Sequence, residues 1–310
     1  MRQLLSIDDL TAADILRLTE CGSASVSLPA TPQPMRGTLA FLFQQPSLRT
    51  LSGFARAGVQ LGLAPVAAAS IGGQLRERCD IHDDIEQLAL TSSCVVARCD
   101  RPLDRDALSR VTAPVVNGGD GINEHPSQAL VDIAAMRSFG LEGRRVVLMG
   151  NLRDHRVHHS LAKALHKLNV PFAALCPAGF EMGPSYLAPG KTCAVTASPQ
   201  EVDEVLHTAD FVYVTPIASY GSPELPGMKA YKLDAERARR VLKPTAKIFH
   251  PFPRLDELAR DLDETEFNAY HLQTRLGPGV RYGLLRWLVD GISPHPSRST
   301  PSLLAVAGTP

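Results

Sequence analysis

Short apolar runs alternate with amphipathic helical patterns along most of the chain, and this alternation constrains the fold more than any other sequence feature. Apolar runs of this length are typical of buried strands, and the segments between them are long enough for helices that cross from one strand to the next. Such an order of elements is typical of parallel sheets. The sequence therefore predicts an α/β fold in which parallel β-sheets are flanked by helices.

Two domains are expected, because 310 residues are enough for two separate cores. A long helix from Asn123 is followed by Gly140 and Gly143, which end it before a new apolar strand. We therefore predict a first domain at 1–140 and a second at 141–279, linked by long interdomain helices. A helix at about 280–292 should pack back on the first domain, and 294–310 should be a disordered tail. The expected strands are Thr38–Phe43, Pro65–Ala69, Ser93–Arg98, Ala113–Asn117, Val146–Met149, Phe172–Leu175, Thr192–Thr196, Phe211–Val214 and Ala246–Phe249.

The charge balance excludes several classes of partner. Thirty-two basic residues offset thirty-two acidic ones, so no global field attracts nucleic acid or a membrane surface. No apolar run is long enough to span a bilayer, and the amino terminus lacks a secretory pattern, so a soluble cytoplasmic protein is expected. The six cysteines lack metal or disulfide spacing and are interpreted as reduced. We predict no metal and no cofactor.

Residues 41–50 form the first segment with chemical content, a strand that runs into a helix. Ser47, Arg49 and Thr50 fall at the helix start, where free backbone N–H groups, hydroxyls and a guanidinium can hold a phosphate without metal. The alternative is an N-capping Ser47 beside a solvent-facing Arg49.

Residues 115–128 form the second, a strand followed by a glycine-rich loop and a helix start. His125 and Gln128 are three residues apart, so on a helix they share a face and can reach one small ligand. The imidazole would contact a carbonyl oxygen and the amide an NH2 group. The alternative is that both satisfy backbone groups at the helix end.

Residues 146–160 form the third, a buried strand, a short loop and a helix. The segment lacks the Gly-x-Gly-x-x-Gly fingerprint, which disfavours a dinucleotide-binding dehydrogenase. Arg156 lies near the helix start and is placed to hold a carboxylate. We interpret His155, His158 and His159 as surface imidazoles rather than metal ligands.

Residues 248–254 form the fourth, in which two prolines follow a strand. The Phe252–Pro253 bond is a candidate cis peptide that aims a backbone carbonyl at a ligand NH2. The alternative is an ordinary proline-rich loop.

Together these segments resemble the aspartate and ornithine carbamoyltransferase family, and most closely its aspartate branch. The most specific stretches are Asn117–Gln128 and His250–Glu257. The resemblance implies two α/β domains, with carbamoyl phosphate bound by the first and the amino-acid acceptor by the second. It also implies a homotrimer in which a loop of the neighbouring subunit completes each site.

The resemblance assigns roles residue by residue. The family's Ser-Thr-Arg-Thr signature falls on 47–50, so Leu48 replaces one hydroxyl but keeps its backbone N–H. The implied carbamoyl phosphate ligands are Ser47, Leu48, Arg49, Thr50, Arg98, His125, Gln128, Phe252 and Pro253. The implied catalytic residues are Arg49, Thr50, Arg98 and His125, and the implied acceptor ligand, for an α-carboxylate, is Arg156.

Two departures from the family pattern affect the acceptor and the neighbour's loop. The usual lysine of that loop has no unique counterpart in residues 70–80, where Gln74, Arg76 or Arg78 could replace it. The arginine and glutamine that grip aspartate's side-chain carboxylate are replaced by Pro216 and Ala218. Loss of such charge-assisted contacts should make aspartate a poor acceptor.

The sequence thus predicts a carbamoyltransferase that acts on the amine of an amino acid, or of an amino-acid-like acceptor, other than aspartate. One alternative is a genuine aspartate carbamoyltransferase, in which Arg275 or Arg281 supplies the missing grip. Another is a catalytically silent homologue with a structural or regulatory role, which Leu48 and the missing lysine favour. The intact set of polar site residues argues against that role.

Overall fold

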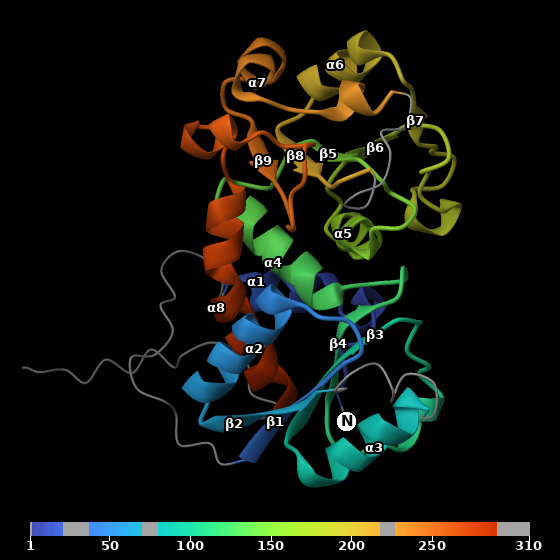
Figure 1. The fold of residues 1–310 in the computed structure, drawn as a ribbon, viewed down its shortest axis with the longest axis vertical. Helices are drawn as coiled ribbons and strands as arrows, with labels where there is room; N and C mark the ends of the chain where they lie inside the picture. The colour runs from blue at the N-terminus through green and yellow to red at the C-terminus, as the bar shows by residue number, and fades with distance from the viewer. Residues whose placement is uncertain (1, 21–36, 70–79, 218–226, 290–310) are drawn as a thin grey trace, which may run out of the picture.

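Two parallel sheets, one above the other in Figure 1, organise the protein. The computed structural model describes residues 2–20, 37–69, 80–217 and 227–289. The strand order is β2-β1-β3-β4 in the first sheet and β7-β6-β5-β8-β9 in the second. Every pairing between neighbouring strands is parallel. The predicted α/β fold, with two domains that each contain a parallel sheet flanked by helices, is confirmed.

The elements of the first domain are α1 (Ala12–Glu20), β1 (Gly37–Phe43), α2 (Leu48–Gln60), β2 (Leu63–Ala69), α3 (Ile81–Thr91), β3 (Cys94–Cys99), β4 (Val115–Asp120) and α4 (Pro126–Arg137). The second domain adds β5 (Val146–Met149), α5 (Arg156–Lys167), β6 (Phe172–Cys176), β7 (Ala194–Val195), α6 (Pro199–His207), β8 (Phe211–Val214), α7 (Ala235–Val241) and β9 (Lys247–Phe249). The last helix, α8 (Tyr270–Val289), packs against α2 and α4 of the first domain. Short 3-10 helices cover Ile7–Asp9, Ala107–Arg110, Pro184–Tyr186, Met228–Tyr231 and Arg260–Glu264. All nine predicted strands are present.

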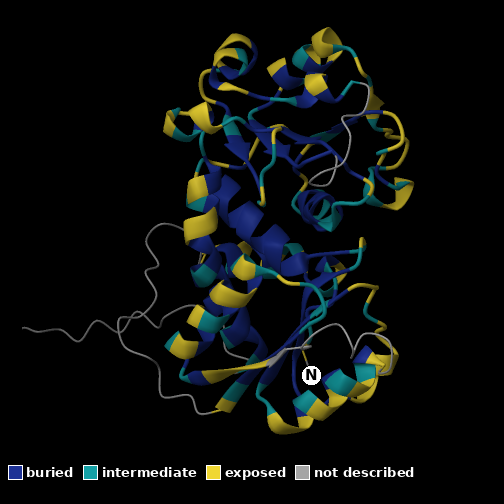
Figure 2. Ribbon diagram, in the orientation of Figure 1, coloured by how far each residue is buried: buried dark blue, intermediate teal, exposed yellow. Residues whose placement is uncertain are grey.

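Helix α4 connects the two domains through a shared core. It is dark blue along almost its whole length in Figure 2, because it packs against α5 and α8 as well as the first sheet. A helix between two domains is expected to be covered on all sides, and α4 accordingly buries Gln128 and Asp132 as well as its apolar residues. One hydrophobic cluster accordingly contains residues from both sheets, including Phe41 of β1 and Leu148 of β5.

Helix α8 is longer than the sequence predicts. It begins at Tyr270 and contains Pro278, whereas the predicted helix begins only at about 280. Proline removes one backbone hydrogen bond and usually interrupts a helix. Here α8 packs against both α2 and α4, and this burial outweighs the local preference.

Helix α4 starts at Pro126 rather than at Asn123, because His125 occupies the N-cap position. The predicted tail 294–310 lies outside the described residues. Among the residues that the structure describes, no helix is both long and apolar enough to cross a bilayer.

Candidate active site

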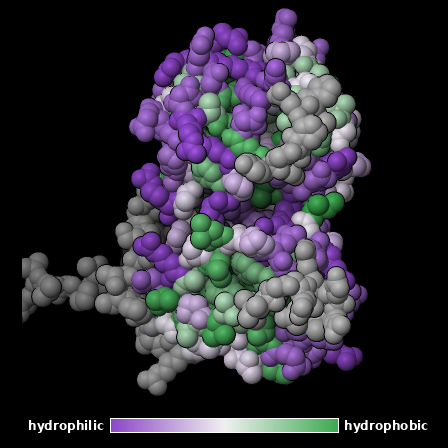
Figure 3. All heavy atoms as spheres, in the orientation of Figure 1, coloured by the Kyte–Doolittle hydropathy of each residue, from purple (hydrophilic) through white to green (hydrophobic). Residues whose placement is uncertain are grey.

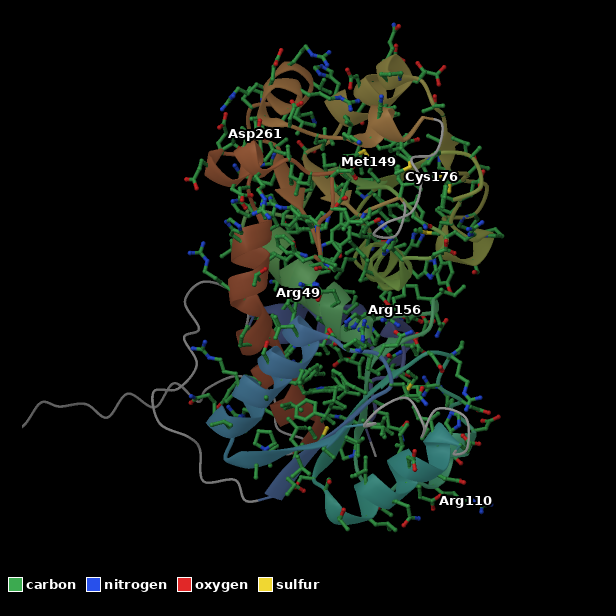
Figure 4. All side chains as sticks on the ribbon, viewed as in Figure 1. Arg49, Arg110, Met149, Arg156, Cys176 and Asp261 are labelled. Carbon is green, nitrogen blue, oxygen red and sulfur yellow. The ribbon has the colours of Figure 1, made fainter. Side chains whose placement is uncertain are left out.

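A cleft of about 500 Å³ lies between the two sheets, where loops from the carboxyl ends of strands in both domains meet. Figure 4 places Arg49 and Arg156 in the region between the two sheets, far from Arg110 and Asp261, which lie toward opposite ends of the molecule. The predicted residues that line the cleft are Ser47, Arg49, Thr50, Arg98, His125, Gln128, Arg156, Phe252 and Pro253. Leu48 does not line it and is 81% exposed. Gln74, Arg76 and Arg78 lie outside the described residues.

The start of α2 has both an N-capping serine and polar side chains that line the cleft, so the two interpretations of this segment are not exclusive. Ser47 is the N-cap, and its side chain accepts a hydrogen bond from the backbone N–H of Thr50. Arg49 is half-buried rather than solvent-facing, and its guanidinium donates to the carbonyl of Phe252 in the other domain. The helix start therefore presents a hydroxyl and a cation to the cleft together.

Three guanidinium groups converge on the cleft. Arg98 donates from Nη1 to the Gly118 carbonyl (2.8 Å), and Arg156 donates to the Gly121 carbonyl (2.7 Å) and to Gln45 Oε1 (3.1 Å). With Arg49, all their hydrogen bonds to described residues end on neutral oxygen atoms. Burial, reinforced by Arg156 and Arg49, lowers the pKa of Arg98 to about 9. Positive charge concentrated in this way creates an anion site.

Gly119 provides the space in which two of these cations approach each other. Its φ of +113° is rare for residues with a side chain. A Cβ atom at this position would lie 2.7 Å from Arg98 Nη1 and 2.8 Å from Arg156 Cζ. The glycine-rich loop is thus required by the packing of the two arginines.

His125 is a neutral hydrogen-bonding group. It is buried, and its Nε2 lies 3.4 Å from Thr50 Oγ1. Burial lowers the pKa of His125 well below its usual value, and the nearby Arg98 and Arg156 lower it further. A neutral imidazole beside a hydroxyl can donate a hydrogen bond to a carbonyl oxygen on which negative charge develops.

Asp132, which the sequence analysis missed, orients Gln128. Gln128 Nε2 donates to Asp132 Oδ1 (2.7 Å), so its Oε1 is left to accept from a ligand NH2. Gln273 and the Tyr213 hydroxyl hold the same carboxyl group at 2.6 and 2.8 Å. The i, i+4 spacing of Gln128 and Asp132 on one helix was the available signal.

Substitution of Asp132 by asparagine should change how stability depends on pH. Burial raises the pKa of Asp132 to about 7, whereas hydrogen bonds from Gln128, Tyr213 and Gln273 oppose the rise. Between about pH 4 and 7 the folded protein therefore holds a proton that the unfolded chain releases, and stability falls as pH rises. The wild type should lose on the order of 2 kcal/mol relative to Asp132→Asn between pH 5 and 7.

Urea unfolding of both proteins at the two pH values measures this difference, because proton linkage at all other groups is common to the pair. Equal changes in the two proteins would contradict a raised pKa for Asp132.

The loop after β9 is fixed by its own hydrogen bonds. His250 Nδ1 accepts from the Phe252 N–H (2.9 Å), and His250 Nε2 lies 2.7 Å from Glu257 Oε1. The Phe252–Pro253 peptide bond is cis, as the sequence predicts. The Phe252 carbonyl faces Arg49, so this loop closes one wall of the cleft.

Among the described residues, the wall formed by the second domain contains a single guanidinium, that of Arg156. Beside it lie Val157, Pro216 and Ile217, which offer no charge. Ala218 lies outside the described residues. Neither candidate for a replacement cation lines this cleft: Arg275 is exposed, and Arg281 is buried against Gly53 and Gly277 beside a separate cavity.

The interpretation of the histidines as surface groups is wrong for two of the three. His158 and His159 are buried, because they face inward from α5. His158 Nε2 is 2.9 Å from Thr215 Oγ1, and the two ring nitrogens of His159 face the carbonyls of Asn123 and Leu152. His155 is half-buried at the cleft. The described part of the chain contains no group of three or more His, Cys, Asp or Glu residues that could hold a metal ion.

Comparison with known proteins agrees with this geometry. Residues 2–138 match the family model "aspartate/ornithine carbamoyltransferase, carbamoyl-P binding domain", and residues 142–288 match "aspartate/ornithine carbamoyltransferase, Asp/Orn binding domain". The aspartate carbamoyltransferase catalytic subunit of Cenarchaeum symbiosum is 30% identical over 92% of this chain and 95% of its own length. That of Thermococcus gammatolerans is 29% identical over 92% and 96%.

Solved structures give the same result. Aspartate transcarbamoylase from Trypanosoma cruzi in complex with carbamoyl phosphate and aspartate has a TM-score of 0.78 and 28% identity, covering 93% of this chain and 95% of that chain. The same enzyme with N-(phosphonacetyl)-L-aspartic acid has a TM-score of 0.77 at 28% identity, with the same coverage. The chain therefore belongs to the aspartate/ornithine carbamoyltransferase family.

Proposed function

We propose that this carbamoyltransferase moves the carbamoyl group of carbamoyl phosphate to the amine of an amino acid, or of an amino-acid-like acceptor, other than aspartate. One observation carries the choice of acceptor. Arg156 is the only cation on the second domain's side of the described cleft, and Pro216 and Ile217 occupy the wall beside it. A second acceptor carboxylate would be desolvated there without a cationic partner, which is costly.

The donor would bind across the start of α2. Its phosphate would lie on the free N–H groups and on Ser47, Arg49 and Thr50, as phosphates do at helix starts. Its carbonyl oxygen would face Arg98 and His125. Its NH2 group would donate to Gln128 Oε1, the atom that Asp132 leaves free. We assign this role to the first domain and acceptor binding to the second.

The reaction would need only positioning and fixed charge. The lone pair of a neutral acceptor amine attacks the carbamoyl carbon, and a new N–C bond forms. The C–O bond to phosphate then breaks, phosphate leaves with the electron pair, and the amine proton passes to it. Thr50, Arg98 and His125 would stabilise the oxyanion, and Ser47 and Arg49 the departing phosphate.

Aspartate is the second candidate acceptor, and the names of the relatives favour it. The curated relatives are aspartate carbamoyltransferases, and a solved relative binds carbamoyl phosphate and aspartate together. For this chain, aspartate would need a cation from outside the described residues, because Arg275 and Arg281 do not line the cleft.

A homotrimer, in which a neighbour's loop completes each site, is part of the proposal. Apolar residues gather over α2 and β2 on the face drawn in Figure 3. The exposed large apolar side chains of these two elements are Leu48, Leu51, Val59 and Val66. Exposed apolar patches of this kind are typical of subunit contacts. The predicted cytoplasmic location remains a prediction.

Calorimetric titration with carbamoyl phosphate, followed by a phosphate-release assay with aspartate, ornithine and 2,3-diaminopropionate, tests the function. We expect donor binding, and release with an amine other than aspartate. Release with aspartate alone would establish the second candidate. Absence of both donor binding and release would contradict the transferase and leave a silent homologue.

A further inference from the structure

Asp154 is the one carboxylate among the described residues that line the cleft. It lies in the loop between β5 and α5, two residues before Arg156, and is half-buried. Asp154 shares this cleft with Arg156, the proposed acceptor ligand, and with the cationic residues of the proposed donor site. A carboxylate is not expected in a cleft that binds only anionic groups. A wall built for a second acceptor carboxylate would exclude such a group, because like charges repel at close range.

The carboxylate is not used to cap the helix. His155 is the N-cap of α5, and no side chain there makes a capping hydrogen bond. Asp154 Oδ2 instead accepts from Asn151 Nδ2 and Arg153 Nη2, both at 3.0 Å, and Oδ1 accepts from Arg153 Nε at 2.9 Å. A carboxylate offers roughly four lone-pair positions, so one position on Oδ1 remains for a ligand N–H.

Asn151 holds this carboxylate in place. Its Oδ1 accepts from the Asp154 N–H (2.9 Å), and its Nδ2 also donates to the Ile217 carbonyl (3.2 Å). The loop carrying Asp154 is thereby tied to the wall that contains Pro216 and Ile217. The side-chain hydrogen bond from Arg153 is the main cause of the lowered pKa of Asp154, so the group is anionic at neutral pH.

The Arg153 contact leaves Asp154 available to a ligand. The side chains of this pair are 55% and 39% exposed, and exposed ion pairs contribute little to stability. The Arg153 guanidinium also lies over the Phe180 ring, 5.3 Å from its centroid. A cation in the less solvated cleft would interact more strongly with the carboxylate than this surface partner does.

We propose that Asp154 binds the ammonium group of a diamino acid acceptor whose α-carboxylate is bound by Arg156, an inference that rests on the proposed carbamoyl transfer. Val157, Pro216 and Ile217 would contact the short aliphatic part between the two charges. The second, neutral amine of the acceptor would attack the carbamoyl carbon, while the ammonium on Asp154 keeps its proton. Asp154 would at the same time repel a dicarboxylate.

Replacement of Asp154 by asparagine in the full-length protein tests this role. The change keeps the size of the side chain but removes its charge. We expect kcat/KM for 2,3-diaminopropionate or 2,4-diaminobutyrate to fall by about 20-fold, the effect of losing one hydrogen bond between charged groups. Asp154→Arg should move the preference toward aspartate. The affinity for carbamoyl phosphate, measured separately by calorimetry, should change less than twofold.

Asp203→Asn is the matched control, because Asp203 is also held by arginines, Arg237 and Arg240, but lies on α6 away from the cleft. It should leave all rates unchanged. Equal losses for diamino and monoamino acceptors in Asp154→Asn would overturn the proposal and make Asp154 a support of the loop. Wild-type activity on aspartate but on no diamino acid would also overturn it. Failure of the proposed carbamoyl transfer would give a different result from failure of the role of Asp154. In that case neither the wild type nor any variant would bind carbamoyl phosphate.

Discussion

The Arg98→Ala substitution is expected to raise the dissociation constant for carbamoyl phosphate by about 1000-fold, an effect of about 4 kcal/mol. Arg98 is half-buried, and its Nε is buried without a partner among the described residues. An incoming anion would therefore meet a guanidinium that is already desolvated and has donors to spare. Loss of such a group removes more binding energy than loss of an exposed charge.

The same substitution should not weaken the ligand-free protein. Burial, Arg156 and Arg49 all disfavour the charged form of Arg98, as its lowered pKa indicates. Removing a repelled cation relieves part of that cost, so we expect the ligand-free variant to melt at or above the wild-type temperature. Carbamoyl phosphate should raise the melting temperature of the wild type only.

Calorimetry and thermal unfolding of the two proteins give both results, with Arg101→Ala as the control. Arg101 is an exposed arginine three residues further along and does not line the cleft. Its replacement should leave donor affinity within about twofold. Donor binding by Arg98→Ala at wild-type strength would show that the anion binds elsewhere.

Features that depend on local sequence could be predicted from it. The nine strands, the two-domain α/β fold and the cis bond at Phe252–Pro253 follow from apolar periodicity and from the position of proline. The convergence of Arg49, Arg98 and Arg156 follows in part from their positions at or after the ends of predicted strands, since carboxyl ends of parallel strands meet at one edge. The full set required the family resemblance as well.

Features that depend on contacts between distant segments could not be predicted. In the sequence, Asp132 cannot be distinguished from any other polar residue of a helix. Only the hydrogen bonds from Tyr213 and Gln273 identify it as a buried hydrogen-bond acceptor. The burial of His158 and His159 could not be predicted either, because helix periodicity does not reveal that α5 is covered on that side. The length of α8 likewise depends on its packing against α2 and α4.

The Gly119→Ala substitution is expected to lower kcat/KM by at least about 100-fold, because a misplacement of about 1 Å at a reacting centre has an effect of this size. The new Cβ would lie within 2.8 Å of atoms of both Arg98 and Arg156, so neither guanidinium could keep its place. The φ of +113° adds backbone strain. Donor and acceptor binding should both weaken, although no group that touches a substrate is removed.

The Gly140→Ala variant is the control that separates the steric contact with the two arginines from the backbone strain of a positive φ. Gly140 also has a positive φ, +78°, but a Cβ added there would have no atom within 4 Å. That variant should lose about 1 kcal/mol of stability and keep kcat/KM within about twofold.

A double-mutant cycle completes the test. In an Arg156→Ala background the substitution at 119 meets only one arginine, so its further effect on donor affinity should be smaller than in the wild type. Non-additivity of this sign is expected for two residues in contact. Strict additivity, or equal effects of the substitutions at 119 and 140, would mean that Gly119 serves only the backbone turn and that the spacing of the two arginines is set elsewhere.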